Sequence, residues 1–389
     1  MPRECPILCF AGDNYWFSNP HSRYHLMHAV HRAGHRVLWV NSIGMNMPRV
    51  RQRGFGKRVV LKLRSWLRWL KAAEPGFWVL TPIALPLFGN RAVERLNAGW
   101  IAWQVRLACA LLGMGRPLVF ASIPSFADVV EAVPRRGLIY YYSDKYDAYR
   151  DLTARESIAA RDRQLFTAAD AVFCASDKVH AALAGDRPEV HYLPHAVDFR
   201  HFHAAVEADV PAPADLAAVP RPRIGYFGSL TDSNDTDMIL HAAREAPDLH
   251  FVLIGRVLGD YRELGALPNV HLLGFKPYAE LPAYGRHFDV AFMAWKLTEW
   301  IRHSNPLKTK EYLSQGLPIV SIPIEELQER FPDLVEFAET GPEFLAAVRR
   351  CLADDSAERR AARIERVRGE SWDARAAEMM DRWREVAHG

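Results

Sequence analysis

The chain has 389 residues, 49% hydrophobic and 24% charged, an ordinary globular composition with room for two domains. No run approaches the roughly 18 apolar residues that a membrane span needs, and the 5 dispersed cysteines argue against a disulfide framework or a zinc site and for a reducing cytosol. The net charge is +3, but residues 1–100 hold 15 Lys or Arg against 4 Asp or Glu, which indicates an anionic surface as a partner of this part.

Short apolar runs alternate with helical patterns in the first half of the chain. Strands are predicted at 7–11, 36–40, 117–121, 138–142, 171–174 and 190–193, and helices at 23–33, 91–112 and 157–169. This βαβ rhythm predicts a mostly parallel sheet covered by helices. The Ala- and Pro-rich stretch at 205–222 has the composition of an interdomain linker.

Residues 47–73 form a basic segment with nine Lys or Arg and no acid. At about 100° per residue, its apolar residues gather on one helical face and basic residues lie beside them. A basic amphipathic helix with tryptophan suits an anionic bilayer surface. The expected membrane contacts are Arg64, Trp66, Leu67, Arg68, Leu70 and Lys71. A surface helix packing on its own domain remains an alternative; nucleic acid is the weaker one and is not expected, because the rest of the chain offers no basic groove or recognisable nucleic-acid module.

The rhythm restarts after the linker, with strands predicted at 223–227, 250–254, 270–273, 289–294 and 318–322, and helices at 236–245, 278–286, 306–315, 342–353 and 372–387. We therefore expect an N-terminal domain at 1–204, a linker at 205–222 and a C-terminal domain at 223–370. A helix at 371–389 is expected to pack back toward the N-terminal domain. Two doubly wound domains in series predict a cleft, with ligands at the carboxyl ends of the strands.

The helix predicted at 306–315 begins with unusual charges. Asn305 is a good N-cap and Pro306 fits the first helical position, so the free N–H groups that follow form an anion site. Lys308 opposes the helix dipole there unless an anion is bound. Glu311 lies three residues further on the same face. A surface ion pair between Lys308 and Glu311 is the alternative, and Lys310 is expected to face solvent.

The residues of the second half resemble a known family. The run from GSL at 228–230 through LIGR at 253–256 to NPLKTKEYLSQGLPIVS at 305–321 is similar to the nucleotide-sugar half of GT-B glycosyltransferases that build bacterial polysaccharides and lipid-linked glycans. The resemblance is strong over 223–323 and extends weakly into the first half through LPHAVDFRHF at 193–202. It implies an α/β fold of two Rossmann-like doubly wound domains facing across a cleft.

The resemblance also implies roles for individual residues. Glu311 would accept both ribose hydroxyls, and Lys308 and Arg256 would neutralise the diphosphate. His303 stands where many retaining members carry Glu, so a retaining and an inverting outcome both stay open. The expected donor-binding residues are Gly228, Arg256, Phe275, His303, Ser304, Asn305, Lys308 and Glu311.

Three residues of the first half are candidates for catalysis. Asp144, in YYSDKYDAYRD, resembles the proposed general base of the xanthan-type glucuronosyltransferase, although a turn or N-cap aspartate has the same pattern. Asp13 follows the first strand, and His25 lies one turn into the next helix. No cofactor and no metal ion are expected, since the nucleotide sugar is a substrate and no His or Cys cluster has ligand spacing.

These features predict a glycosyltransferase of EC class 2.4 that moves a sugar from a nucleoside diphosphate, expected to be UDP, to a hydroxyl of a lipid-linked or polysaccharide acceptor. The basic segment predicts a cytoplasmic protein attached peripherally to the inner face of the cell membrane. A degenerate protein of the same fold that binds a nucleotide or glycan without turnover is the alternative. An epimerase or phosphorylase of this fold is a third.

Overall fold

The computed structural model describes residues 5–16, 20–42, 69–84, 91–142, 155–187, 189–302 and 304–388. The chain divides into two compact units, which are described one at a time. Unit 1 comprises residues 1–194 and 375–389, and unit 2 comprises residues 195–374.

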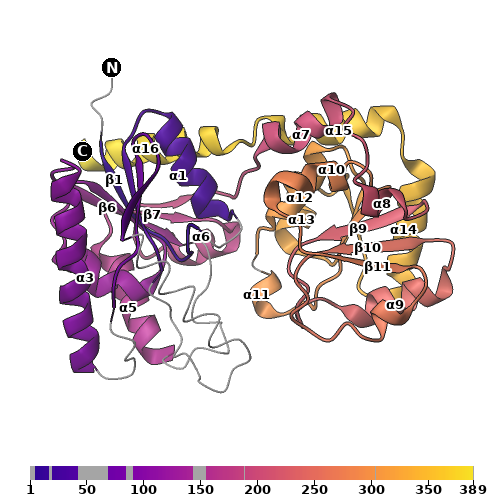
Figure 1. The fold of residues 1–389 in the computed structure, drawn as a ribbon, viewed down its shortest axis with the longest axis horizontal. Helices are drawn as coiled ribbons and strands as arrows, with labels where there is room; N and C mark the ends of the chain where they lie inside the picture. The colour runs from indigo at the N-terminus through magenta and orange to yellow at the C-terminus, as the bar shows by residue number, and fades with distance from the viewer. Residues whose placement is uncertain are drawn as a thin grey trace. The chain divides into compact units, whose positions relative to one another are not determined.

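Unit 1 is built on an eight-stranded sheet in the order β3-β4-β2-β1-β5-β6-β7-β8 (Figure 1). All neighbouring strands are parallel except β3 and β4, which are antiparallel. The central strands are apolar runs buried along their whole length, as expected for a parallel sheet covered on both faces. The strands are β1 Ile7–Phe10, β2 Val37–Val40, β3 Leu70–Glu74, β4 Phe77–Leu80, β5 Leu118–Ala121, β6 Gly137–Tyr142, β7 Ala171–Cys174 and β8 Val190–Tyr192.

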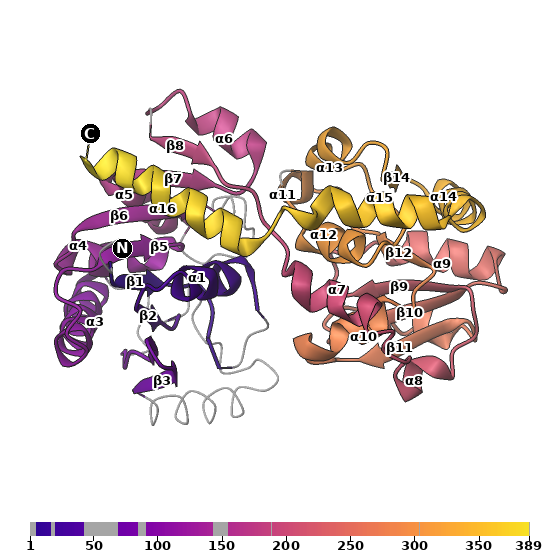
Figure 2. The same cartoon turned by 90° about the horizontal axis from the view of Figure 1, so that it is seen from above.

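Helices cover both faces of this sheet. One face packs on α3 Arg91–Leu111, α4 Ala127–Ala132 and α5 Arg155–Ala168, which contribute Ile101, Val130 and Leu165 to one hydrophobic core. Figure 2 shows α1 and α16 side by side over the sheet, and Trp383 of α16 lies against Gly137 of β6. The remaining helical elements of unit 1 are α1 Ser22–Arg32, the 3-10 turn η1 Pro124–Phe126, α6 Asp177–Leu183 and the part of α16 Trp372–His388 that begins at Arg375.

Unit 2 is built on a six-stranded, fully parallel sheet in the order β11-β10-β9-β12-β13-β14. The strands are β9 Arg223–Phe227, β10 His250–Ile254, β11 Val270–Gly274, β12 Val290–Met293, β13 Ile319–Ser321 and β14 Val335–Phe337. The helical elements are α7 Phe199–Glu207, α8 Ala214–Ala217, α9 Thr236–Glu245, η3 Leu264–Ala266, η4 Tyr278–Glu280, α10 Leu281–Gly285, α11 Glu299–Arg302, α12 Leu307–Ser314, α13 Glu325–Arg330, α14 Gly341–Asp354 and α15 Ala357–Arg368.

The strand order of unit 2 determines where a ligand is expected. The chain runs outward from β9 through β10 to β11 and then returns to β12 on the other side of β9, so the switch point lies between β9 and β12. In open α/β sheets, ligands bind beyond the carboxyl ends of the strands at such a point. Here Gly228 follows β9 directly, and Trp295 lies two residues beyond the end of β12.

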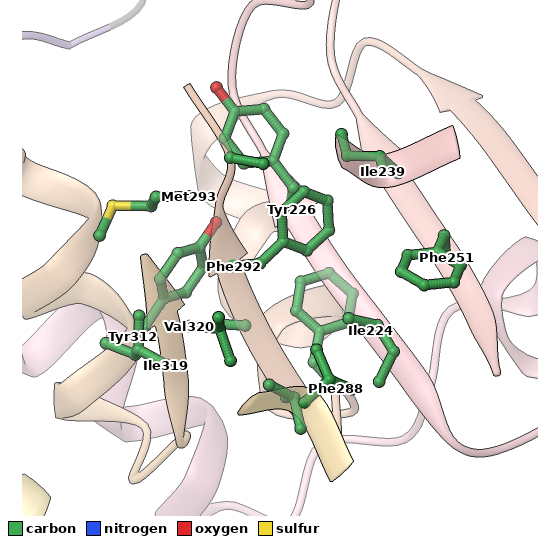
Figure 3. Packing of buried hydrophobic residues seen from close by; sticks show 14 of the residues in the cluster. Ile224, Tyr226, Ile239, Phe251, Phe288, Phe292, Met293, Tyr312, Ile319 and Val320 are labelled. Atoms are coloured by element: carbon green, nitrogen blue, oxygen red, sulfur yellow. The ribbon is translucent and has the colours of Figure 1, made fainter. Parts of the chain in front are cut away.

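The core of unit 2 joins helix α12 to this sheet. Tyr312 of α12 lies among the side chains of the central strands, close to Phe292 and Val320 (Figure 3). Its ring centroid is 4.6 Å from that of Phe227, and its hydroxyl oxygen accepts a hydrogen bond from the Phe227 backbone N–H at 3.0 Å. The last residue of β9 and the middle of α12 are therefore held together by one buried side chain.

The unit boundary differs from the domain limits predicted from the sequence. It lies between Pro194 and His195 instead of at residue 204, and the proposed linker at 205–222 is part of unit 2. Leu216 and Val219, within that stretch, are buried in the core of unit 2, and Asp215 pairs with Lys276 at 2.5 Å. The Ala- and Pro-rich composition was misleading because the few large apolar residues of the stretch pack on the domain.

The amphipathic helix predicted within the basic segment at 47–73 is wrong at its end. Leu70–Glu74 forms strand β3, which pairs with β4 Phe77–Leu80 through a turn in which Gly76 has a φ of +87°. The Pro-Gly pair of this turn was the signal for a hairpin. Leu70 packs on the core of unit 1, and the Lys71 ammonium lies 5.3 Å from the centroid of the Trp16 ring. The other expected membrane contacts, Arg64, Trp66, Leu67 and Arg68, lie outside the described residues.

Candidate functional site

Two glycine turns meet at the carboxyl edge of the sheet in unit 2. Gly228 follows β9 with a φ of +152°, and Gly255 follows β10 with a φ of +158°, a region that favours glycine. A Cβ atom on Gly255 would lie 1.8 Å from the Gly228 carbonyl oxygen. The Gly228 N–H donates to the Ile254 carbonyl at 2.8 Å. Backbone alone therefore forms this part of the edge.

The Lys308 side chain lies over Gly228. A Cβ atom on Gly228 would be 2.5 Å from Lys308 Cε and 2.7 Å from the Tyr226 hydroxyl. The Lys308 ammonium lies 5.7 Å from the centroid of the Tyr226 ring and 5.5 Å from that of Trp295. Within the described ranges no carboxylate forms an ion pair with Lys308, so the alternative of a surface pair with Glu311 is not found. The Tyr226 and Trp295 rings therefore flank the Lys308 ammonium at the switch point.

Glu311 lies one turn further along α12 and is partly buried. Burial is the main cause that raises the pKa of its carboxyl group to about 7. The negative charge of Asp198 also raises this pKa, and the positive charge of Lys308 lowers it in part. Among the described residues, none donates a hydrogen bond to the Glu311 carboxylate. A carboxylate in such a place costs free energy unless a ligand supplies donors.

The beginning of α12 differs from the sequence prediction. The helix begins at Leu307 with Pro306 as its N-cap residue, and no side chain caps it. Asn305 does not act as the cap, because its buried amide donates to Glu326 at 2.5 Å and its carbonyl accepts from Nδ1 of His195 at 2.8 Å. The Ser304 hydroxyl donates to the Ile301 carbonyl at 2.7 Å. Both side chains hold the segment that leads into α12.

The prediction that Lys310 faces solvent is wrong. Only 1% of its surface is exposed; its ammonium lies 2.6 Å from Glu370 and donates to the His195 carbonyl. Burial alone would raise the pKa of Glu370, but Lys310 and Arg330 lower it to about 2. Helix α12 is thus attached to residues 195 and 370, which lie close to the two points where the chain passes between the units.

Arg256 and Phe275 lie at the outer end of the same edge. The Arg256 side chain is exposed, and its Cζ lies 4.6 Å from the centroid of the Phe275 ring, which is also exposed. Each follows a strand, β10 for Arg256 and β11 for Phe275. A guanidinium and an aromatic face are thereby presented to solvent next to the glycine turns.

The other predicted site residues fall elsewhere. Asp13 follows β1 in unit 1, where the Arg23 guanidinium pairs with it at 3.2 Å. His25 is buried in α1, and its ring centroid lies 5.5 Å from that of Tyr24. Asp144 and His303 lie outside the described residues.

The sequence did not predict that Tyr226 and Trp295 lie beside Lys308 or that Asp198 lies near Glu311. The signal for Trp295 was its place two residues after the end of the buried strand β12. Tyr226 and Asp198 had no comparable signal. In the part of the chain that the structure describes, no group of three or more His, Cys, Asp or Glu side chains is arranged to hold a metal ion. Nor does any described helix have the length and hydropathy needed to cross a membrane.

Comparison with known proteins gives similar chains at the level of sequence. Residues 236–381 match the glycosyl transferase-like family. The putative teichuronic acid biosynthesis glycosyltransferase TuaH of Bacillus subtilis (strain 168) is 28% identical over 216 residues, which are 52% of this chain and 54% of the relative. The match thus spans about half the length of that curated relative.

Solved structures give the fold. An α,α-trehalose-phosphate synthase (UDP-forming) from Burkholderia vietnamiensis aligns with a TM-score of 0.69 and 14% identity over 99% of this chain and 98% of its own. The structure described as trehalose-6-phosphate from E. coli bound with UDP-2-fluoro glucose aligns with a TM-score of 0.66 and 11% identity over 98% and 99%. The prediction of two Rossmann-like domains is confirmed. Residues 236–381 match the glycosyl transferase-like family, and the chain as a whole has the GT-B fold.

Proposed function

We propose that the chain is a glycosyltransferase that transfers a sugar from a nucleoside diphosphate, with UDP as the expected nucleotide, to a hydroxyl of a glycan or lipid-linked acceptor. One observation carries the proposal: a lysine ammonium lies over a glycine turn at the switch point, and one turn away lies a carboxylate with no described hydrogen-bond donor. A nucleotide sugar supplies both missing partners, a diphosphate for Lys308 and a ribose diol for Glu311.

The chemistry of the step follows from these positions. As the bond between the sugar and the diphosphate breaks, negative charge develops on the diphosphate oxygen that leaves. Lys308 and Arg256 would stabilise that charge, and the glycine backbone at 228 admits the diphosphate close to them. The proposal therefore uses cationic side chains in the place of a metal ion. The acceptor hydroxyl must lose a proton as it attacks, and Asp144 remains the proposed base.

Donor binding is the direct test. We expect UDP to bind the parent protein in titration calorimetry, and Glu311→Ala and Lys308→Met each to weaken binding at least tenfold, the loss of one charge-assisted contact. Glu365→Ala is the matched control, because Glu365 is exposed on α15 and, of the residues that the structure describes, it pairs with Arg368 alone, in the same helix. Unchanged affinity in both site variants would refute the assignment. Tight UDP binding without sugar transfer or donor hydrolysis would instead favour the degenerate binding protein.

Two parts of the proposal concern the acceptor. The name of the Bacillus subtilis relative refers to teichuronic acid biosynthesis, which supports a polysaccharide acceptor. The excess of Lys and Arg in residues 1–100 supports the proposal that the enzyme acts at the inner, anionic face of the membrane. Transfer to lipid-linked and to soluble glycans, compared with one radiolabelled UDP-sugar, distinguishes the two acceptor classes.

A further inference from the structure

Helix α3 carries an apolar stripe on its solvent side. Leu96, Trp100, Trp103 and Leu111 are 69%, 46%, 52% and 64% exposed, respectively. Their spacing of four, three and eight residues places them along one face of a helix. The two indole rings stack, with centroids 5.0 Å apart and an angle of 13° between their planes. Meanwhile Ile101, Val105 and Ala108 bury the opposite face in the core of unit 1.

The stripe accounts for nearly all exposed large hydrophobic side chains in the described part of unit 1. The one other is Ile83, which is 38% exposed, and it adjoins the same helix because its backbone N–H donates to Gln104 of α3 at 2.9 Å. Single exposed hydrophobic residues are normal on a protein surface. A contiguous set with two stacked tryptophans on one element is typical of an interaction surface.

The charges around the stripe are basic. Arg95 and Arg106 are exposed and, by helical spacing, share one flank of the stripe. The sequence of α3 holds three arginines and one glutamate, and residues 1–100 hold 15 Lys or Arg against 4 Asp or Glu. Charge of this sign complements an anionic surface. Tryptophan, with an apolar body and a polar N–H group, is enriched at the boundary between lipid and water.

We infer that the α3 stripe, defined by Leu96, Trp100, Trp103 and Leu111, docks unit 1 on an anionic lipid surface. The helix lies in the plane of the headgroups with the stripe facing the acyl chains, and Arg95 reaches the lipid phosphates, whereas the Arg106 guanidinium donates to the Ala132 carbonyl. The stripe is roughly 22 Å long, from 15 residues at about 1.5 Å each. Figure 1 shows α3 as a long helix at the edge of unit 1. The inference rests on the proposed function, which includes activity at a membrane surface. It adds that helix α3 makes the contact with the lipid.

Vesicle binding by the full chain tests this. We expect the parent to cosediment with vesicles rich in phosphatidylglycerol and far less with phosphatidylcholine alone. The double variant Trp100→Gln and Trp103→Gln should lose at least tenfold in vesicle affinity, and Arg95→Gln about fivefold, the effect of about 1 kcal/mol per arginine near an anionic surface. Brominated lipids should quench parent fluorescence more than that of the double variant. A second pair of exposed hydrophobics, changed by Val257→Gln and Leu258→Gln in unit 2, is the matched control and should leave vesicle affinity unchanged.

Several results would overturn the inference. Equal vesicle binding by the parent and the Trp100 and Trp103 variant removes α3 from the contact, as does the absence of vesicle binding by the parent. Light scattering that shows a dimer dissolved by the same variant, with no vesicle binding, assigns the stripe to a second copy of the chain. UDP affinity measured without vesicles separates this failure from a failure of the proposed function, because the stripe variants should bind UDP as the parent does.

Discussion

Replacing Glu311 with glutamine should stabilise the protein and at the same time weaken donor binding. Burial raises the pKa of Glu311 from 4.5 to about 7, so the native state holds this proton at pH values at which the unfolded chain has lost it. The stability of the parent therefore falls as pH rises from about 4.5 to about 7 and is constant above. At about 1.4 kcal/mol per pH unit, ionised Glu311 costs about 3 kcal/mol at pH 8.

Thermal unfolding without nucleotide measures this. Glutamine stays neutral, so Glu311→Gln should unfold about 6–12 °C higher than the parent at pH 8, the shift expected for about 3 kcal/mol in a unit of this size. Well below pH 4.5 the two proteins should coincide, because Glu311 is then protonated in the native and the unfolded states alike. The control Glu365→Gln, at an acid that is 72% exposed, should show no gain that depends on pH. A difference between parent and Glu311→Gln that is the same at both pH values would refute the reasoning.

The binding arm of the same experiment uses a UDP-sugar, whose diphosphate stays fully ionised between pH 6 and 8. If the carboxylate must be ionised to accept the ribose hydroxyls, parent affinity should fall about tenfold from pH 8 to pH 6. Glu311→Gln should bind weakly with no such pH dependence. Parallel pH profiles in parent and variant would remove Glu311 from the ribose contact.

The remaining predictions concern the residues that hold α12 and the glycine turn. Lys310→Met should cost about 3 kcal/mol of unfolding free energy in urea, since Glu370 would stay buried with only the arginine pairs of Arg330 and Arg366; a loss under about 1 kcal/mol contradicts the buried pair. Gly228→Ala should weaken UDP binding at least tenfold while the protein stays folded, because its Cβ would displace Lys308. Gly185→Ala, where a Cβ meets nothing within 4 Å, is its control, and equal affinities in the two variants would contradict the site.

Most of the fold could be predicted from the sequence because its central strands are unbroken apolar runs. Strand β9 at Arg223–Phe227 and helix α9 at Thr236–Glu245 coincide with the predicted limits. Strands β3, β4 and β14 were missed. The first two form a hairpin whose polar edge strand resembles the preceding helical pattern, and the third has only 3 residues. Local patterns are weakest where strands are short or lie at an edge.

The candidate site was predictable in part. The spacing of Lys308 and Glu311 indicated that both belong to one helix beside the switch point, and the structure places them there. The partners of Lys310 and Asn305 could not be predicted, because Glu370 and Glu326 are distant in sequence. Hydrogen bonds of this kind depend on how separate segments pack, and no periodicity in the chain records them.

The sequence by itself determined the βαβ order, the glycine turns at 228 and 255 and the presence of a helix that carries Lys308 and Glu311. These are local properties: backbone conformation at a glycine and the periodicity of apolar residues. Only the tertiary structure decided which charges of α12 are free to meet a ligand. Lys310 forms a buried ion pair with Glu370, whereas Lys308 and Glu311 face the edge of the sheet. Burial and ion pairing depend on the segments that fold against the helix, and the sequence of the helix does not record them.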